Sequence, residues 1–338
     1  MKLFVFLSVI SGFLLADPQV RVSVATPAER FVLTGDKGEK FEVKASKTGV
    51  ILNGKQTGQT SLEIKADLLE VDAKKFRQII EVKLKSDMLI LMHTLPMESY
   101  IAGVISSELP TSWPLEVLKA QAIAARTYAL WQLAKKTHLE TSVLDQVYFG
   151  VQREHKLAKQ AAEETAGQVL TYDSKPIHAY FHACCGGHTA SAQEVFGSNE
   201  PYLQGVACSY CHKAPIFKWT YDFSRRELDK KLGANIKKLE STGETNSGRV
   251  EKFRFKSRPV LSDMKSGDFR KNLGYNLLRS TLLTKYSLGW SKAEFEGRGH
   301  GHGVGMCQWG ALNMAKQGKK AEEILGFYYP GTEIRKFY

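Results

Sequence analysis

Length, composition and charge limit what this chain can be. It has 338 residues, of which 43% are hydrophobic, and its 47 basic and 35 acidic residues give a net charge of +12. A chain of this length and hydrophobic content can bury a substantial core, which excludes a largely disordered protein and suggests two domains. The positive charge indicates an anionic partner or surface. Because the basic residues are scattered along the chain, we do not expect nucleic acid to be that partner.

The first stretch of the chain, MKLFVFLSVISGFLLA, combines one lysine with an apolar run that ends before Asp17 and Pro18. This pattern is typical of an export signal, and we predict a signal peptide over residues 1–16. Leu14 is bulky for the third position before the cleavage site, so retention of the segment as a membrane anchor stays open. We therefore predict export to the periplasm or cell envelope, where envelope polymers could meet the basic surface.

Residues 17–94 are expected to form a β-rich N-terminal region. Short alternating runs such as VRVSVA, RFVLTG and IIEVKLK are separated there by Gly, Asn, Asp and Lys turns. The period changes at Leu95-Pro96, and two consecutive helices are predicted in MESYIAGVISSELP and SWPLEVLKAQAIAARTYALWQLAKK. Residues 95–338 are predicted to be one mixed helix/strand domain. The fold class expected for the whole chain is α+β.

Later segments of this domain show weaker patterns. Residues 160–215 suggest a helix, a short hairpin and a cysteine-bearing loop. Residues 216–296 suggest strands, a helix around residues 268–282, and a helix whose first turn Ser224 and Glu227 could close with a capping box.

Glu108, in the stretch SSELP, is the first candidate for chemistry. It falls at the predicted end of the first helix, which Pro110 stops. A carboxylate at this end faces the negative pole of the helix dipole, which raises its pKa and favours the protonated form that a general acid needs. An ordinary exposed glutamate in a loop is the alternative interpretation.

A second carboxylate would be needed for a conventional glycosidase pair. Glu98 lies on the same predicted helix, about 15 Å from Glu108 along the axis. Such pairs are separated by about 5 to 9.5 Å, so Glu98 is too far away. Asp145, in LDQVYFG, could approach Glu108 through folding.

The second predicted helix carries Lys119 and Arg126, seven positions apart on one face of an alanine-rich surface. Arginine suits bidentate binding of a substrate carboxylate. A solvated basic face is the alternative.

Near the end of the chain, GRGHGHGVGMCQWGALNMAKQG places glycines around two histidines, His300 and His302. Dense glycine implies unusual backbone angles or close approach to another group. The helical spacing that follows, with Gly318 as a stop, predicts that these glycines lead into a helix N-terminus. Simple turns with solvated histidines remain the alternative.

The five cysteines include a C-x₂-H pair, Cys185 and His188, and a C-x₂-C pair, Cys208 and Cys211. These ligand types and spacings predict a structural zinc site of three cysteines and one histidine, with Cys184 as a substitute ligand. A disulfide is the alternative, because export permits one. His178 and His182 alternate with apolar residues and are as consistent with a strand as with metal ligation.

Several stretches together resemble the SpoIID/LytB family, from about residue 60 to the C-terminus and in the family's order. They are PMESYIAGVISSELPTSWPLEVLKAQAIAARTYAL, DQVYFG, AYFHACCGGHTASAQEVFG with PYLQGVAC, and GHGHGVGMCQWGALNMAKQGKKAEEILGFYYPGTEI. Glu108 occupies the position of the family's catalytic glutamate, in SELP where the family usually has Glu-Met-Pro. Arg126 matches the arginine of its AARTY motif. Cys307 replaces the serine of its GHGVGMSQ motif, which removes a hydroxyl.

The resemblance implies a peptidoglycan lytic transglycosylase or, in the LytB branch, an enhancer of a wall amidase. A muramidase that uses water is a third interpretation. The resemblance also implies a glycan-binding groove in residues 95–338. There we expect Glu108 to act alone as acid and base on strands without stem peptides, with no catalytic cofactor. The expected substrate-binding residues are Arg126, Lys119, Asp145, Tyr148, His302 and Gln308. Zinc in some members sits in a different loop, so the ligands predicted above rest on spacing.

Overall fold

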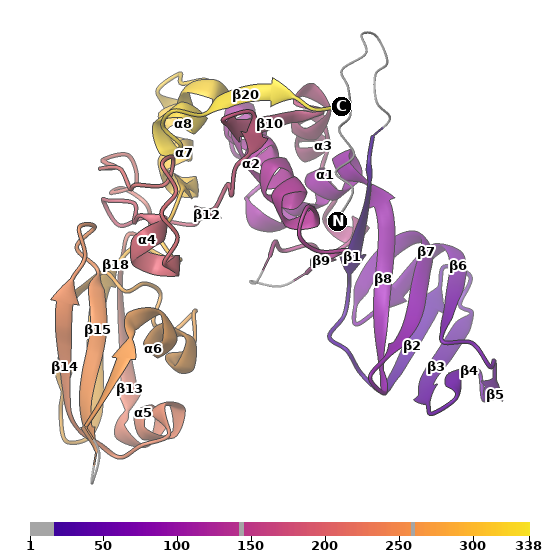
Figure 1. Ribbon diagram of the computed structural model, residues 1–338, viewed down its shortest axis with the longest axis horizontal. Coiled ribbons are helices and arrows are strands. Elements are labelled where there is room, and N and C mark those ends of the chain that lie inside the picture. Colours follow the sequence, from indigo (N-terminus) through magenta and orange to yellow (C-terminus); the bar gives the residue numbers. More distant parts are fainter. Residues whose placement is uncertain (1–16, 142–144, 258–260) are drawn as a thin grey trace, which may run out of the picture.

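The structure is a computed structural model that describes residues 17–141, 145–257 and 261–338 (Figure 1). The predicted signal peptide, residues 1–16, lies outside these residues. Within the described ranges, no helix is long and apolar enough to cross a membrane. Helices and open sheets both contribute extensively, which confirms the α+β class.

The N-terminal region forms a nine-stranded sheet in the order β5-β4-β3-β2-β6-β7-β8-β1-β9. Neighbouring strands are antiparallel except β1 and β9, which are parallel. In β2, Phe31 and Leu33 are buried while their neighbours are more exposed, as the alternating sequence predicts. The strands are β1 Gln19–Ser23, β2 Arg30–Gly35, β3 Lys40–Ser46, β4 Gly49–Leu52, β5 Lys55–Gln56, β6 Ser61–Val71, β7 Lys74–Lys85, β8 Met88–Pro96 and β9 Leu139–Glu140.

Two helices follow the sheet, α1 (Met97–Glu108) and α2 (Leu115–Leu133). Each begins directly after a proline, Pro96 or Pro114, whose missing N–H is not needed at that position. Further along, η1 (Val151–Arg153) and α3 (Lys156–Glu164) complete this part of the chain, and α3 packs against both α1 and α2. The alanines of α2 are buried, and their small side chains permit the close packing of the three helices.

The C-terminal segment returns to the helices (Figure 1). Strand β10 pairs with β11 and also with β20, while β12 runs parallel to β19 and thereby places His182 opposite Cys307. These elements are β10 Gln168–Tyr172, β11 Lys175–Pro176, β12 Phe181–His182, α4 Ala192–Phe196, β19 Met306–Cys307, α7 Gln308–Lys316, α8 Ala321–Tyr328 and β20 Glu333–Lys336.

A separate segment, residues 218–298, forms two three-stranded sheets, β13-β18-β17 and β14-β15-β16, with two helices. Its core, which includes Phe223, Phe253 and Phe295, is distinct from the core shared by the N-terminal sheet and the helices. The sequence analysis expected residues 95–338 to form one domain and did not identify this segment as a unit with its own core. Ser224 accepts the Glu227 N–H at the start of α5, at the position expected for a cap. The elements are β13 Lys218–Ser224, α5 Arg225–Leu232, β14 Ile236–Glu244, β15 Val250–Ser257, β16 Leu261–Lys265, α6 Ser266–Leu273, β17 Leu283–Leu288 and β18 Lys292–Arg298.

Candidate active site

Glu108 is the last residue of α1 and is partly exposed. Its Oε1 accepts the backbone N–H of Val147 at 3.0 Å, and its carboxyl group is also hydrogen-bonded by the side chain of Gln308. Burial raises the pKa of Glu108, and these two hydrogen bonds act in the opposite direction. A raised pKa was expected from the helix dipole, but here the largest cause is desolvation. Glu108 is therefore a partly exposed residue whose carboxyl group is biased toward its protonated form.

Gln308 connects the glycine-rich stretch to this carboxyl group. It is the first residue of α7, is only 6% exposed, and donates through Nε2 to Gln121 Oε1 of α2 at 3.3 Å. The end of α1, the middle of α2 and the beginning of α7 thus meet at one point. Gln308 contacts Glu108 and Gln121 and is almost entirely shielded from solvent, and its predicted role in substrate binding remains a prediction.

The loop that begins at Asp145 presents the Val147 N–H to Glu108, but Asp145 and Tyr148 do not face solvent as predicted. The Asp145 side chain is 2% exposed and pairs with Lys136. Tyr148 is also 2% exposed, and its ring covers Gly103, where an added Cβ would lie 2.5 Å from the ring. Both predictions of substrate binding are corrected, because the two side chains hold the loop against α1 and the sheet.

Gln146 is a residue of this loop that the sequence did not single out. Its Nε2 donates to Ala125 O at 3.1 Å and its Oε1 accepts the Tyr100 hydroxyl at 3.0 Å. It therefore fixes the backbone next to Val147 from both sides. The signal available in the sequence was the motif DQVYFG, but the motif does not say which of its residues point inward.

Arg126 is fully buried, which corrects its prediction as a substrate ligand. Its guanidinium pairs with Glu98 through Nε at 2.9 Å and Nη2 at 2.5 Å. It also donates to the backbone oxygens of Gln168 and Ala162. Arg126 therefore joins α1, α2 and the end of α3, and it has no surface to offer a glycan.

Lys119 lies on the same side of α2 as Arg126 and is also engaged within the protein. Its ammonium group contacts Glu164 of α3 and, at 3.5 Å, Glu116. The Lys119 side chain remains 22% exposed. These contacts favour a role in the packing of α3, and substrate binding by Lys119 remains a prediction.

His302 uses both ring nitrogens inside the protein. Nε2 donates to Phe181 O at 2.9 Å, and Nδ1 accepts the Val304 N–H at 3.1 Å, which fixes the neutral tautomer. Burial lowers the pKa of His302 to about 3. The predicted hydrogen bond from His302 to a sugar hydroxyl is therefore corrected, because neither nitrogen is available.

The glycines around His302 are explained by the approach of other parts of the same chain. Gly303 and Gly305 have φ values of 88° and 70°, which favour glycine. An added Cβ at Gly305 would lie 2.0 Å from Tyr180 O, and one at Gly303 would lie 2.4 Å from Arg249 Nη2. Close approach was the correct expectation, but the approaching groups are protein atoms. The predicted glycan-binding groove stays a prediction.

Partly exposed aromatic residues near the site were missed. Trp309, next to Gln308, packs edge-to-face against Trp113, with 5.1 Å between the ring centroids. A second group surrounds His178. Its ring stacks on that of Trp131 with 3.4 Å between the ring centroids, and its centroid lies 3.7 Å from that of Tyr180. His182 is a strand residue of β12, and its Nδ1 lies 3.0 Å from Val304 O.

Three of the four predicted metal ligands come together, and the fourth is replaced. The sulfurs of Cys185, Cys208, Cys211 and Cys307 lie within 4.8 Å of one another. His188 is outside this group, with Nδ1 2.7 Å from Thr189 O. Cys184 is also outside it, although Cys184 is buried and pairs through its backbone with His300. All five cysteines are free, so no disulfide joins them in the structure.

Comparison with known proteins identifies the family. Residues 85–172, which contain Glu108, Arg126 and Val147, match the profile of the SpoIID family, described as Stage II sporulation protein. Stage II sporulation protein D of Bacillus subtilis is 34% identical over 266 residues, covering 72% of this chain and 75% of that protein. The chain belongs to the SpoIID/LytB family. A protein of Brachyspira hyodysenteriae, named only as uncharacterized, is 38% identical over 260 residues, covering 74% of this chain and 69% of that protein.

The LytB side of the family is also represented. A Bacillus subtilis protein named Amidase enhancer is 29% identical over 291 residues, covering 70% of this chain and 40% of that protein. This SpoIID/LytB chain therefore has relatives with both names.

Proposed function

We propose that this SpoIID/LytB protein is a peptidoglycan lytic transglycosylase that cleaves the MurNAc–GlcNAc β-1,4 bond with Glu108 as its acid and base. Family membership supports a role in the cell wall. The observation that carries the reaction is the environment of Glu108, which is partly exposed while burial raises its pKa. Such a carboxyl group holds its proton to higher pH than an ordinary glutamate does, and it can deliver that proton to a bound substrate.

The reaction needs two proton transfers at the same carboxyl group. Protonated Glu108 donates to the glycosidic oxygen as the bond from C1 of MurNAc breaks. The C6 hydroxyl oxygen of that sugar attacks C1, and the Glu108 carboxylate accepts the hydroxyl proton, which leaves a 1,6-anhydro ring. The Val147 N–H and the Gln308 side chain stabilise the carboxylate between the two transfers.

One carboxylate suffices for this reaction because the nucleophile belongs to the substrate and is already positioned. The other acidic candidates are engaged elsewhere. Glu98 lies about 15 Å away along the helix and binds Arg126. Asp145 pairs with Lys136 and accepts the Glu140 N–H at 2.8 Å. These contacts favour single-residue catalysis over a two-carboxylate hydrolysis.

The test is the chemistry of the product. Peptidoglycan with stem peptides and strands from which an amidase has removed them should both be digested, because buried Arg126 gives no reason to expect selection between them. Mass spectrometry should find 1,6-anhydroMurNAc ends and no new reducing ends. Reducing MurNAc ends would instead identify a muramidase that uses water.

The second candidate is an enhancer of a cell-wall amidase, favoured by the relative named Amidase enhancer. An amidase assay with and without the protein tests it. Stimulation of the amidase that Glu108→Gln retains, without any glycan cleavage by the wild type, would replace the transglycosylase proposal. Either activity requires export to the envelope, which we propose from the predicted signal peptide; detection of the protein only in the cytoplasm would contradict it.

A further inference from the structure

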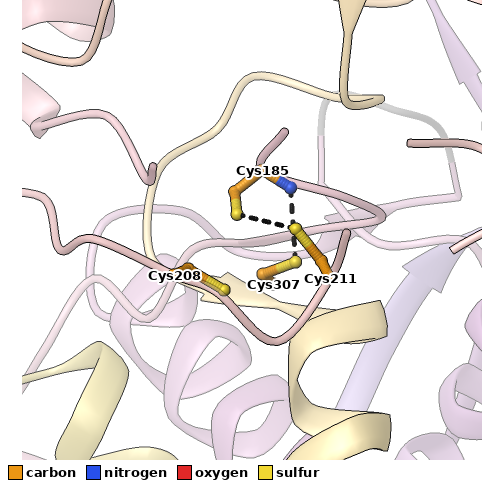
Figure 2. Close-up of side chains that lie close together, drawn as sticks. All are labelled: Cys185, Cys208, Cys211 and Cys307. Atoms are coloured by element: carbon orange, nitrogen blue, oxygen red, sulfur yellow. Dashed lines mark hydrogen bonds between the residues drawn. The ribbon is translucent and has the colours of Figure 1, made fainter. Parts of the chain in front are cut away.

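Four buried cysteines converge beside the candidate active site from three separate segments (Figure 2). Cys185 follows β12, Cys208 and Cys211 stand in the loop before β13, and Cys307 ends β19. Their sulfurs all lie within 4.8 Å of one another. A tetrahedral ion with bonds of about 2.3 Å places its sulfur ligands roughly 3.8 Å apart, so the group has the right size for one ion.

The shortest separation is between Cys185 and Cys211, whose sulfurs are 3.3 Å apart. A disulfide has an S–S bond of about 2.05 Å and uses two sulfurs only. Here all four sulfurs lie within 4.8 Å of one another, which two separate disulfides would not require. The arrangement favours a shared central ligand.

The sulfurs also receive hydrogen bonds that suit thiolates. Cys307 Sγ accepts the backbone N–H groups of Cys185 at 3.2 Å and Gly310 at 3.3 Å. The Tyr328 hydroxyl lies 3.2 Å from Cys208 Sγ. Gly310 is required at its position, because an added Cβ would lie 1.9 Å from that hydroxyl. Such partners hold metal-bound sulfurs in place and stabilise their negative charge.

A buried cation lies next to the group. Arg249, 2% exposed, donates through Nη2 to Cys185 O at 2.9 Å and through Nη1 to His188 O at 3.1 Å. These partners are neutral carbonyls, and a buried charge is costly unless opposite charge is near. Four thiolates around a divalent cation carry a net charge of −2, which would compensate the guanidinium.

We propose that Cys185, Cys208, Cys211 and Cys307 bind one structural zinc ion. Four soft thiolates in a closed tetrahedral arrangement suit zinc, and a site without an open position is structural. Zinc binding releases the thiol protons and ties three segments together. One of these segments continues from Cys307 into Gln308, which contacts Glu108, so the ion positions the start of α7 beside the candidate acid.

The first experiment measures the metal in the purified protein. Elemental analysis should find about one zinc per chain, and X-ray absorption should find four sulfurs at about 2.3 Å. Three sulfurs with one nitrogen at about 2.0 Å would restore His188 as a ligand. Iron as the bound metal, or a metal-free protein with a mapped disulfide among these cysteines, would overturn the zinc proposal.

The second experiment compares variants after dialysis against a chelator. Cys307→Ser removes a thiolate but keeps an oxygen that can accept the Gly310 N–H, because serine is a strong helix cap. It should lose its zinc, while Cys184→Ser and His188→Ala retain it. Zinc retained by Cys307→Ser, or lost by His188→Ala, would contradict the assignment. Because the experiment measures metal content, its result tests the zinc proposal independently of glycan cleavage.

Discussion

The two ends of helix α1 carry glutamates with opposite environments. At the first turn, Glu98 accepts two bonds from Arg126, one from the Tyr338 hydroxyl at 2.6 Å and one from the Gly167 N–H at 3.2 Å. At the last residue, Glu108 accepts from the Val147 N–H and Gln308, with no cation among its described partners. Glu98 is thus engaged in an ion pair and further hydrogen bonds, whereas the carboxyl group of Glu108 receives hydrogen bonds only.

The difference shows how the two ends of one helix can give two carboxylates different surroundings. Glu98 stands at the positive end of the helix dipole, and its partner is the buried cation of Arg126. Glu108 stands at the negative end, and desolvation raises its pKa. One helix therefore separates a structural anion from a candidate acid.

The largest effect should follow from replacing each glutamate with glutamine. Glu108→Gln removes the proton donor, so cleavage of glycan strands should fall by about 10²–10⁴-fold or more without loss of fold. Glu98→Gln should leave the turnover of the folded protein nearly unchanged but lower its melting temperature. The two variants are compared by their initial rates of glycan cleavage and by their melting temperatures. Normal cleavage of glycan strands by Glu108→Gln would show that Glu108 is not the catalytic acid.

Breaking the ion pair at the first turn should mainly cost stability. Arg126→Ala leaves a carboxylate with no cation in a mostly buried site, which costs about 3–5 kcal/mol. Lys119→Ala, on the same side of α2, is the matched control and should cost less than about 1 kcal/mol. Denaturant unfolding of the two variants measures the difference. A loss of activity by folded Arg126→Ala only on strands without stem peptides would instead indicate substrate recognition.

The raised pKa of Glu108 should also appear in stability. Its protonated form is favoured in the folded state, so its contribution to stability is present below its ordinary pKa of 4.5 and is lost as pH rises through the folded value. Glu108→Gln cannot ionise and should escape this loss. The melting temperature of the variant minus that of the wild type should therefore grow as pH rises above 4.5. A difference that does not change with pH would show that the pKa is not raised.

The smallest effect should come from Gln308. Its hydrogen bond lowers the pKa of Glu108, so Gln308→Leu should raise that pKa and move the alkaline limb of the activity profile to higher pH. Replacement of partly exposed Trp309 by Leu is a control on the neighbouring position and should leave the limb in place. A pH-rate profile in which only the overall rate falls would contradict direct contact between Gln308 and Glu108.

The strands and the two central helices could be predicted because local patterns specify them. Alternating residues in β2 and prolines before α1 and α2 identify those elements without reference to the rest of the chain. Glu108 could be placed for the same reason, since Pro110 fixes the end of its helix. The separate core of residues 218–298 could not be predicted, because its phenylalanines are far apart in sequence and meet only after folding.

Most of the remaining site residues depend on such distant contacts. The sequence shows that Arg126 is basic but not that Glu98 faces it, and it shows that Tyr148 is aromatic but not that Gly103 leaves room for its ring. Cys307 was missed as a member of the cysteine group because it stands 96 positions after Cys211. Short spacing suggested His188 instead, but the pairing of β12 with β19 brings the distant cysteine into the group.

The paired ends of residues 218–298 make this segment a cassette within the chain. Lys218 lies opposite Arg298 in the ladder of β13 and β18, and the Gly299 N–H donates to Phe217 O at 2.8 Å. The chain therefore leaves and re-enters the body that carries Glu108 at adjacent points. An insertion of this form can change in length or content during evolution without rerouting the backbone on either side. Arg249 reaches from this segment to the backbone of Cys185, so its exchange would alter the surroundings of the cysteine group before those of Glu108.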